Sequence, residues 1–132
     1  MENMENNLYE ALTASETLVM KCIWDAEREV SLADIFEMVN SQYNKGWKYQ
    51  TVSTFLAKLV QKGFISPRRE GHRVIYEILI SENDYKADQA KQFINFWNRG
   101  SVRQFLTAFY KERKITKEEL EELRKTIEEL DN

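Results

Sequence analysis

Residue types that build catalytic and metal sites are scarce in this chain of 132 residues. One cysteine, Cys22, and one histidine, His72, are present, so an internal disulfide, a metal site built from several histidines and a catalytic triad are excluded. A glycine-rich phosphate loop and an HExxH motif are also missing. We therefore expect no catalytic residues, no cofactor and no bound metal, and we expect that the protein is not an enzyme.

Long apolar runs are missing as well. No stretch approaches the ~18 apolar residues that a membrane-spanning helix needs, and the start "MENMENNLYE" lacks the features of a signal peptide. Cys22 lies in an apolar helical pattern, which is typical of a small buried hydrophobic residue. With 31% charged residues and no possible internal disulfide, we expect a soluble cytoplasmic protein with no membrane insertion.

Acidic residues are absent from one long segment. The chain has 22 Asp and Glu, yet none lies between Met38 and Arg69, and several basic residues fall within or just after that segment: Lys45, Lys48, Lys58, Lys62, Arg68, Arg69 and Arg73. The net charge of −3 would argue against a nucleic-acid partner, but a local asymmetry of charge is more informative than the total. The segment is predicted to form a surface that meets a polyanion.

Capping motifs mark where the helices begin. Thr13–Glu16 and Thr116–Glu119 have the spacing of a capping box, and similar patterns occur at Ser31, Ser81 and Ser101. Together with apolar residues at helical spacing, they predict helices over 14–26, 32–43, 49–62, 82–98, 101–112 and 117–130.

A β-hairpin is predicted after the third helix. Gly63 can end that helix, and two runs rich in β-prone residues, "FISPRR" and "RVIYEILI", flank a turn at Glu70–His72. Pro67 suits an edge strand or a bulge, and a short extra strand is expected near Val30. The predicted fold is mainly α: a winged helix-turn-helix, of the α+β type, over 1–80, followed by three helices over 81–132.

The third predicted helix has two unlike faces. One is an apolar stripe, and the other carries small or neutral side chains and lysines but no acid. In winged helices the third helix enters the major groove and the hairpin contacts the backbone, so carboxylates are disfavoured there. The DNA-binding residues that we expect are Lys48, Tyr49, Gln50, Thr51, Ser53, Thr54, Lys58, Arg68, Arg69, His72 and Arg73, and Lys62 is expected to add a phosphate contact.

Three of these assignments have alternatives. The Thr51 hydroxyl suits either a phosphate or a bond within the first helical turn. The basic hairpin tip would bind phosphate or form a solvated turn. Trp47, just before the helix, would pack against the fold or stack on a base.

The motifs resemble those of the BlaI/MecI/CopY family of bacterial repressors, the penicillinase repressors. Glu16–Trp24 is similar to the family pattern "EWxVMxxxW", with Thr17 in place of the usual Trp. Thr51–Leu59 followed by Lys62–Gly63 resembles the recognition helix "TVxTLLxRLxxKG", and Arg69–Arg73 resembles the wing.

The resemblance implies a homodimeric, sequence-specific DNA-binding repressor on a dyad-symmetric operator, usually with TACA/TGTA half-sites, controlling resistance or stress genes. It places the dimer contacts in the C-terminal helices. The residues themselves support this, since three short helices carry more apolar surface than they can bury alone. The interface is expected to include Phe93, Ile94, Trp97, Phe105, Leu106, Phe109, Leu120, Leu123 and Ile127. Packing of these helices onto the N-terminal domain is the alternative.

The resemblance also implies release by a membrane sensor-protease system that cuts an Asn-Phe bond. The corresponding bond here is Ala108–Phe109, which departs from the pattern, and the cysteine cluster of copper-sensing members is absent. A function of another class stays open: a winged-helix protein-interaction module whose basic face docks an acidic partner. The expected domains are a DNA-binding domain over 1–80 and a dimerisation domain over 81–132.

Overall fold

Capping boxes set the starts of the first two helices in the computed structural model, which describes residues 8–131. In α2 (Ala14–Ala26) the Thr13 hydroxyl accepts from the Glu16 amide while the Glu16 carboxylate accepts from the Thr13 amide. Ser31 and Asp34 form the same reciprocal pair at α3 (Leu32–Tyr43). Each box satisfies two backbone N–H groups that the helix leaves free. Both predicted helices are confirmed with their boundaries.

Helix α4 (Tyr49–Gln61) ends in a Schellman motif. The amide of Phe64 donates to the carbonyl of Leu59, and the amide of Gly63 donates to that of Val60, each at 3.0 Å. Gly63 adopts a φ of +85°, a left-handed conformation that favours glycine. The predicted glycine stop is therefore confirmed, and it directs the chain from the end of α4 into the sheet.

Three antiparallel strands make a small sheet in the order β1-β3-β2. They are β1 (Val30–Ser31), β2 (Ile65–Glu70) and β3 (Arg73–Ile78). Pro67 lies in β2, an edge strand, where its missing N–H costs no ladder bond on the open side. The hairpin turn needs only Gly71 and His72, and Gly71 has the positive φ, +64°, that suits the first turn position. The hairpin and the short strand near Val30 are as the sequence predicts.

The core of this part of the chain lies between α2, α3, α4 and the sheet. Val19, Met20, Val52, Leu56 and Phe64 are fully buried there. Cys22 is 1% exposed, burial raises the pKa of its thiol to about 11, and its Sγ donates to the Gln42 side-chain oxygen. It is the buried, un-ionised residue that its helical pattern indicates.

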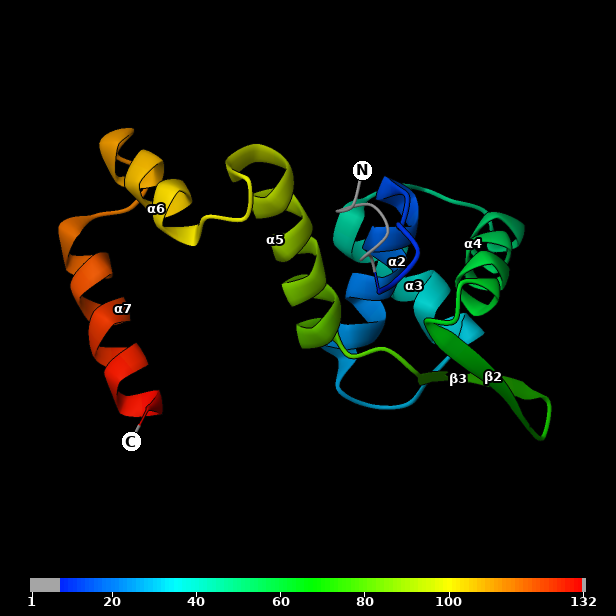
Figure 1. Ribbon diagram of the computed structural model, residues 1–132. Helices are drawn as coiled ribbons and strands as arrows, with labels where there is room; N and C mark the ends of the chain where they lie inside the picture. The colour runs from blue at the N-terminus through cyan, green and yellow to red at the C-terminus, as the bar shows by residue number, and fades with distance from the viewer. Residues whose placement is uncertain (1–7, 132) are drawn as a thin grey trace. The chain divides into compact units, whose positions relative to one another are not determined.

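The chain divides into two compact units within α5 (Glu82–Asn98), between Gln89 and Ala90. In the first unit the β2–β3 hairpin projects from the helices, with its tip pointing away from them (Figure 1). This projection is the wing of the winged helix.

The second unit holds the rest of α5 together with α6 (Val102–Lys111) and α7 (Lys117–Leu130). The Ser101 hydroxyl caps α6 and a Thr116–Glu119 capping box starts α7. Phe93 and Phe105 pack edge to face with ring centroids 5.9 Å apart, and Phe105 stacks on Phe109 at 5.1 Å.

The six helices and three strands found within residues 8–131 confirm a mainly α fold with a small β-hairpin wing. Over the same residues, no helix has the length and apolar character to cross a bilayer.

Candidate nucleic-acid interface

Helix α4 turns one face inward and the other to solvent. Val52, Leu56 and Leu59 are fully buried against α2 and α3. The outer face carries Gln50, Thr54, Ala57, Lys58 and Gln61, which are all exposed, and Ser53, which is half-buried at its margin. Because neither Ser53 nor Thr54 belongs to the core, this face has the short, uncharged hydroxyl and amide groups that base edges accept.

The start of α4 is open to an anion. Lys48 is the N-cap residue, and its side chain makes no capping hydrogen bond, so the first amides lack the side-chain partner that α2 and α3 have. Tyr49 is 48% exposed, with its ring centroid 5.3 Å from that of Phe36 on α3. Free amides at a helix N-terminus beside a lysine favour a phosphate group.

The Thr54 hydroxyl is already engaged as a donor. It donates to the carbonyl of Gln50 at 3.0 Å, one turn earlier in α4. Its oxygen lone pairs and its methyl group remain for a partner, so Thr54 can accept a hydrogen bond or contact a thymine methyl. Thr51, next to it at the helix start, is half-buried, and both of its sequence-based alternatives stand.

The loop between α3 and α4 is held by one amide side chain. Asn40 donates to the carbonyl of Trp47 at 3.0 Å and accepts from the Trp47 amide at 2.8 Å. The Trp47 ring packs 5.0 Å from that of Phe55 and is half-buried. These contacts favour the packing role for Trp47 over base stacking.

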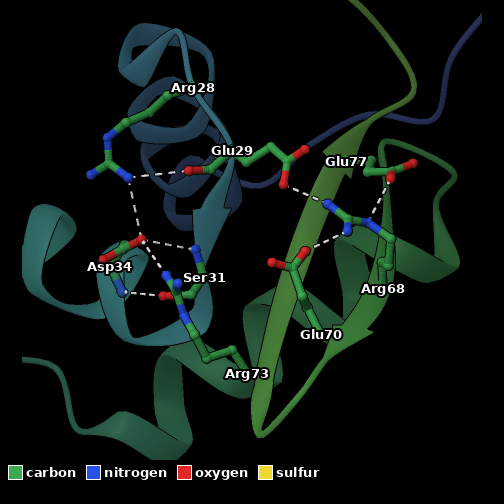
Figure 2. A network of polar contacts seen from close by, with 8 residues as sticks. All are labelled: Arg28, Glu29, Ser31, Asp34, Arg68, Glu70, Arg73 and Glu77. Atoms are coloured by element: carbon green, nitrogen blue, oxygen red, sulfur yellow. Dashed lines mark hydrogen bonds and ion pairs between the residues drawn. The ribbon is translucent and has the colours of Figure 1, made fainter.

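The wing presents basic side chains at its tip. Arg69, His72 and Arg73 are exposed around the two-residue turn. A terminal nitrogen of Arg73 lies 3.5 Å from the carboxylate of Asp34, which also pairs with Arg28 at 3.3 Å (Figure 2). The Ser31 amide and, to a lesser extent, Arg28 lower the pKa of Asp34, so this carboxylate is ionised where it meets the wing.

Arg68 lies among carboxylates. Its guanidinium pairs with Glu29 at 2.5 Å, Glu70 at 2.6 Å and Glu77 at 2.9 Å (Figure 2). The hydrogen bonds to Glu70 and Glu29 raise the pKa of Arg68. Sequence reasoning missed these acids. The alternation of side chains in the hairpin places Glu70 and Glu77 on the face of Arg68, but no local pattern pointed to Glu29.

Lys62 forms an ion pair with a buried carboxylate. Its ammonium lies 2.6 Å from the carboxylate of Glu16 and donates to the carbonyl of Ala11 at 2.8 Å. Burial alone would raise the pKa of Glu16, which is 2% exposed, but the bonds from Lys62 and the Thr13 amide outweigh it and lower that pKa. The sequence analysis expects Lys62 to contact a DNA phosphate, whereas in the structure its ammonium pairs with Glu16.

Within residues 8–131, no group of three or more His, Cys, Asp or Glu side chains is placed to hold a metal ion. What the first unit offers instead is an acid-free helix face beside a projecting hairpin with basic residues at its tip.

Comparison with known proteins finds relatives among bacterial repressors. The family model described as "Penicillinase repressor" matches residues 12–129. The methicillin resistance regulatory protein MecI of Staphylococcus aureus (strain N315) is 31% identical over 124 residues, which cover 94% of this chain and 98% of that protein. The penicillinase repressor of Bacillus licheniformis is 26% identical over 121 residues, with 92% of each chain covered. The solution structure of the DNA-binding domain of the repressor BlaI aligns with a TM-score of 0.49 and 24% identity, covering 56% of this chain and 87% of that domain.

Proposed function

The chain belongs to the penicillinase repressor family, which makes it a DNA-binding transcriptional repressor and not an enzyme, and we propose that it acts as a homodimer on a dyad-symmetric operator. In this proposal α4 enters the major groove and reads base edges, while the wing contacts the phosphate backbone. Since operator DNA lies in the cytoplasm of a bacterium, we propose that the protein works there.

The outer face of α4 is the observation that carries this proposal. Gln50 is exposed and has the amide that can bond an adenine edge through two hydrogen bonds. Ser53 and Thr54 follow on the same face, and Lys48 and Lys58 flank it at positions suited to phosphate. The one charged residue within α4, Lys58, is basic, which is the charge that a groove lined by phosphates requires.

A second copy of the chain would cover the apolar surface of the second unit. Within that unit Phe93 is 52% exposed, Trp97 is 66% exposed and Ile127 is 50% exposed. Leaving such residues in water is unfavourable. An isologous contact would bury the same residues on both copies of the chain. With two α4 helices in one dimer, half-sites about one helical turn apart, roughly 34 Å, or slightly more are expected.

Selection of bound sequences from a random duplex pool tests the proposal. The full chain should enrich an inverted repeat, because two symmetry-related α4 helices would read the same half-site in opposite directions. A single half-site without a repeat would contradict the dimeric part. No enrichment, with only salt-sensitive binding to all sequences, would contradict sequence-specific reading by α4. Absence of DNA binding would point to a docking module for an acidic partner.

Resistance or stress genes are the proposed targets, and a membrane sensor-protease system is the proposed means of release. The bond that such a system would cut is Ala108–Phe109, within α6. Ala108 is exposed and Phe109 is 39% exposed, but both residues are in helical conformation, so the helix must open first. Mass spectrometry of the chain from β-lactam-treated cells should then find a fragment ending at Ala108. An intact chain together with induced target genes would contradict this route.

A further inference from the structure

Each nitrogen of the Arg68 guanidinium has a carboxylate partner. Nε pairs with Glu77, one terminal nitrogen with Glu70 and the other with Glu29. Each of the three nitrogens therefore donates one hydrogen bond to a carboxylate, which uses three of the five N–H groups of the guanidinium. One positive charge also faces three negative ones, so the cluster as a whole repels a phosphate.

The partners of Arg68 come from separate parts of the sheet. Arg68 and Glu70 lie in β2 and Glu77 lies in β3, whereas Glu29 immediately precedes β1. Because the strand order is β1-β3-β2, the pair between Arg68 and Glu29 crosses β3 and joins the two edges of the sheet. This contact ties the projecting hairpin to the connection between α2 and α3.

The side chain beneath this contact is buried. The pairing register places Ser31, Ile75 and Arg68 in one row across the three strands. Ile75 is only 3% exposed although it lies outside the main core cluster, so it is covered on the outer face of the sheet, where Arg68 is its neighbour. The long stem of an arginine is suited to covering an apolar residue while its charged end is held by acids.

The next residue, Arg69, points to the other face. Successive side chains of a strand alternate, so Arg69 shares the face of Pro67 and of its cross-strand partner Val74. It is exposed, and no ion pair of Arg69 occurs within residues 8–131. Two adjacent arginines of one strand thus have opposite surroundings: Arg68 pairs with three carboxylates, whereas Arg69 has no ion pair within the described residues.

We propose that Arg68 is a positioning residue that holds the wing against the segment before β1, and that Arg69 is the arginine of β2 that binds DNA phosphate. This inference rests on the proposed DNA-binding function. Each exposed ion pair contributes little to the folding free energy, so the expected effect is on the position of the wing and not on overall stability.

The matched variants Arg68→Gln and Arg69→Gln test the assignment, since each removes one charge from neighbouring positions of β2. Binding of the full-length protein to a random 30-base-pair duplex is measured over a range of salt concentrations. R69Q should reduce the slope of log affinity against log salt by about 0.9 for each protomer bound, because one phosphate contact is lost. R68Q should retain the slope, while its affinity for the selected operator falls on the order of fivefold. An equal loss of slope in R68Q would overturn the assignment.

A measurement without DNA separates positioning from contact. In hydrogen exchange of the free protein, the amides of β2 and β3 should exchange faster in R68Q than in R69Q, with the α2 and α4 amides unchanged. Equal protection of the hairpin in both variants would contradict the positioning role. If the unaltered chain fails to bind any duplex, the proposed function itself is wrong, whereas the exchange result still reports on the contact of Arg68 with the sheet.

Substitution of Glu29, an acidic partner of Arg68, changes DNA affinity in opposite directions under the two assignments of Arg68. Glu29→Gln weakens the pair with Arg68, and Glu27→Gln removes an equal charge from the same connection, where Glu27 is exposed. If Arg68 is a positioning residue, E29Q lowers operator affinity relative to E27Q. If Arg68 binds phosphate, E29Q frees it and raises the affinity for random duplex above that of E27Q, which would overturn the inference.

Discussion

Lys62, the C-cap residue of α4, lies 2.6 Å from Glu16 at the start of α2, and the Glu16 side chain is 2% exposed. The carboxylate also caps its own helix through the Thr13 amide. The pair therefore joins the end of the proposed recognition helix to the first helix of the fold. A buried carboxylate left without its counter-ion is strongly destabilising, which gives this contact a measurable consequence.

Lys62→Met is expected to lower the free energy of unfolding by about 3 kcal/mol, because it leaves Glu16 ionised and buried. Urea denaturation at neutral pH measures the change. Lys58→Met, on the exposed face of the same helix, is the control and should change stability by less than about 0.5 kcal/mol. A similar small effect in K62M would contradict a structural role for this pair.

The same contact predicts a dependence on pH. The pKa of Glu16 is lowered in the folded chain, so its ionised form stabilises the fold above the unfolded pKa, and this contribution is lost as pH falls through the folded pKa. In K62M the raising effect of burial is no longer opposed by the lysine, so protonation of Glu16 relieves the defect. The stability gap between wild type and K62M should therefore narrow as pH falls from neutral, first because protonation of Glu16 stabilises K62M and then, below about pH 4.5, because wild type loses its own contribution. A gap that stays constant or widens at low pH would argue against this assignment.

Ser53→Glu is expected to abolish operator binding while leaving the fold intact, since a carboxylate on the outer face of α4 meets the phosphates that line the groove. Like-charge contact of this kind costs several kcal/mol, so the affinity should fall roughly a hundredfold or more. Gel shift measures binding and circular dichroism checks folding. Ser53→Ala is the uncharged control, with a much smaller loss. Operator affinity equal to wild type in S53E would count decisively against placing α4 in the groove.

Arg73→Ala should weaken binding to all DNA sequences alike and reduce the salt slope by about 0.9 per protomer, because it removes a phosphate contact and no base contact. Arg28→Ala is the matched control, since Arg28 also pairs with Asp34 but lies outside the proposed interface. Affinity over a salt series, with operator and random duplex, measures both variants. A loss confined to the operator would assign Arg73 to base reading.

Ile127→Asp is expected to dissociate the proposed dimer. Ile127 is 50% exposed on α7 in the single chain, and losing its burial in two copies costs roughly 3 kcal/mol, before the cost of burying two carboxylates. Sedimentation equilibrium over a concentration series measures the change. Thr126→Asp, at the neighbouring exposed position, introduces the same charge and should leave association unchanged. Equal effects of the two variants would place the dimer contact elsewhere.

Local sequence signals predicted most of the fold. The capping residues at Thr13, Ser31 and Thr116 act within four positions of the chain, so their spacing alone indicated where α2, α3 and α7 begin. Gly63 marked the end of the third helix for the same reason. The differences are small: α4 ends one residue earlier than expected, and α6 is shorter by one residue at each end.

Partners of the basic residues were not predictable in this way. Glu29 is 39 positions from Arg68, and Glu16 is 46 positions from Lys62. No periodicity of either segment encodes such a contact, because it depends on how helices and strands pack. The sequence therefore identified which residues of the segment are basic, and the packing determined which of their charges remain free.

The two hydrogen bonds between Asn40 and Trp47 have a consequence for how DNA preference could change. They fix the backbone that leads into α4 from a residue of α3, and neither group lies on the outer face of α4. Replacements at Gln50, Ser53 or Thr54 would alter the chemistry offered to a base and leave the docking angle of the helix as it is. New operators could thus be acquired by exchanging a few exterior side chains on an unchanged scaffold.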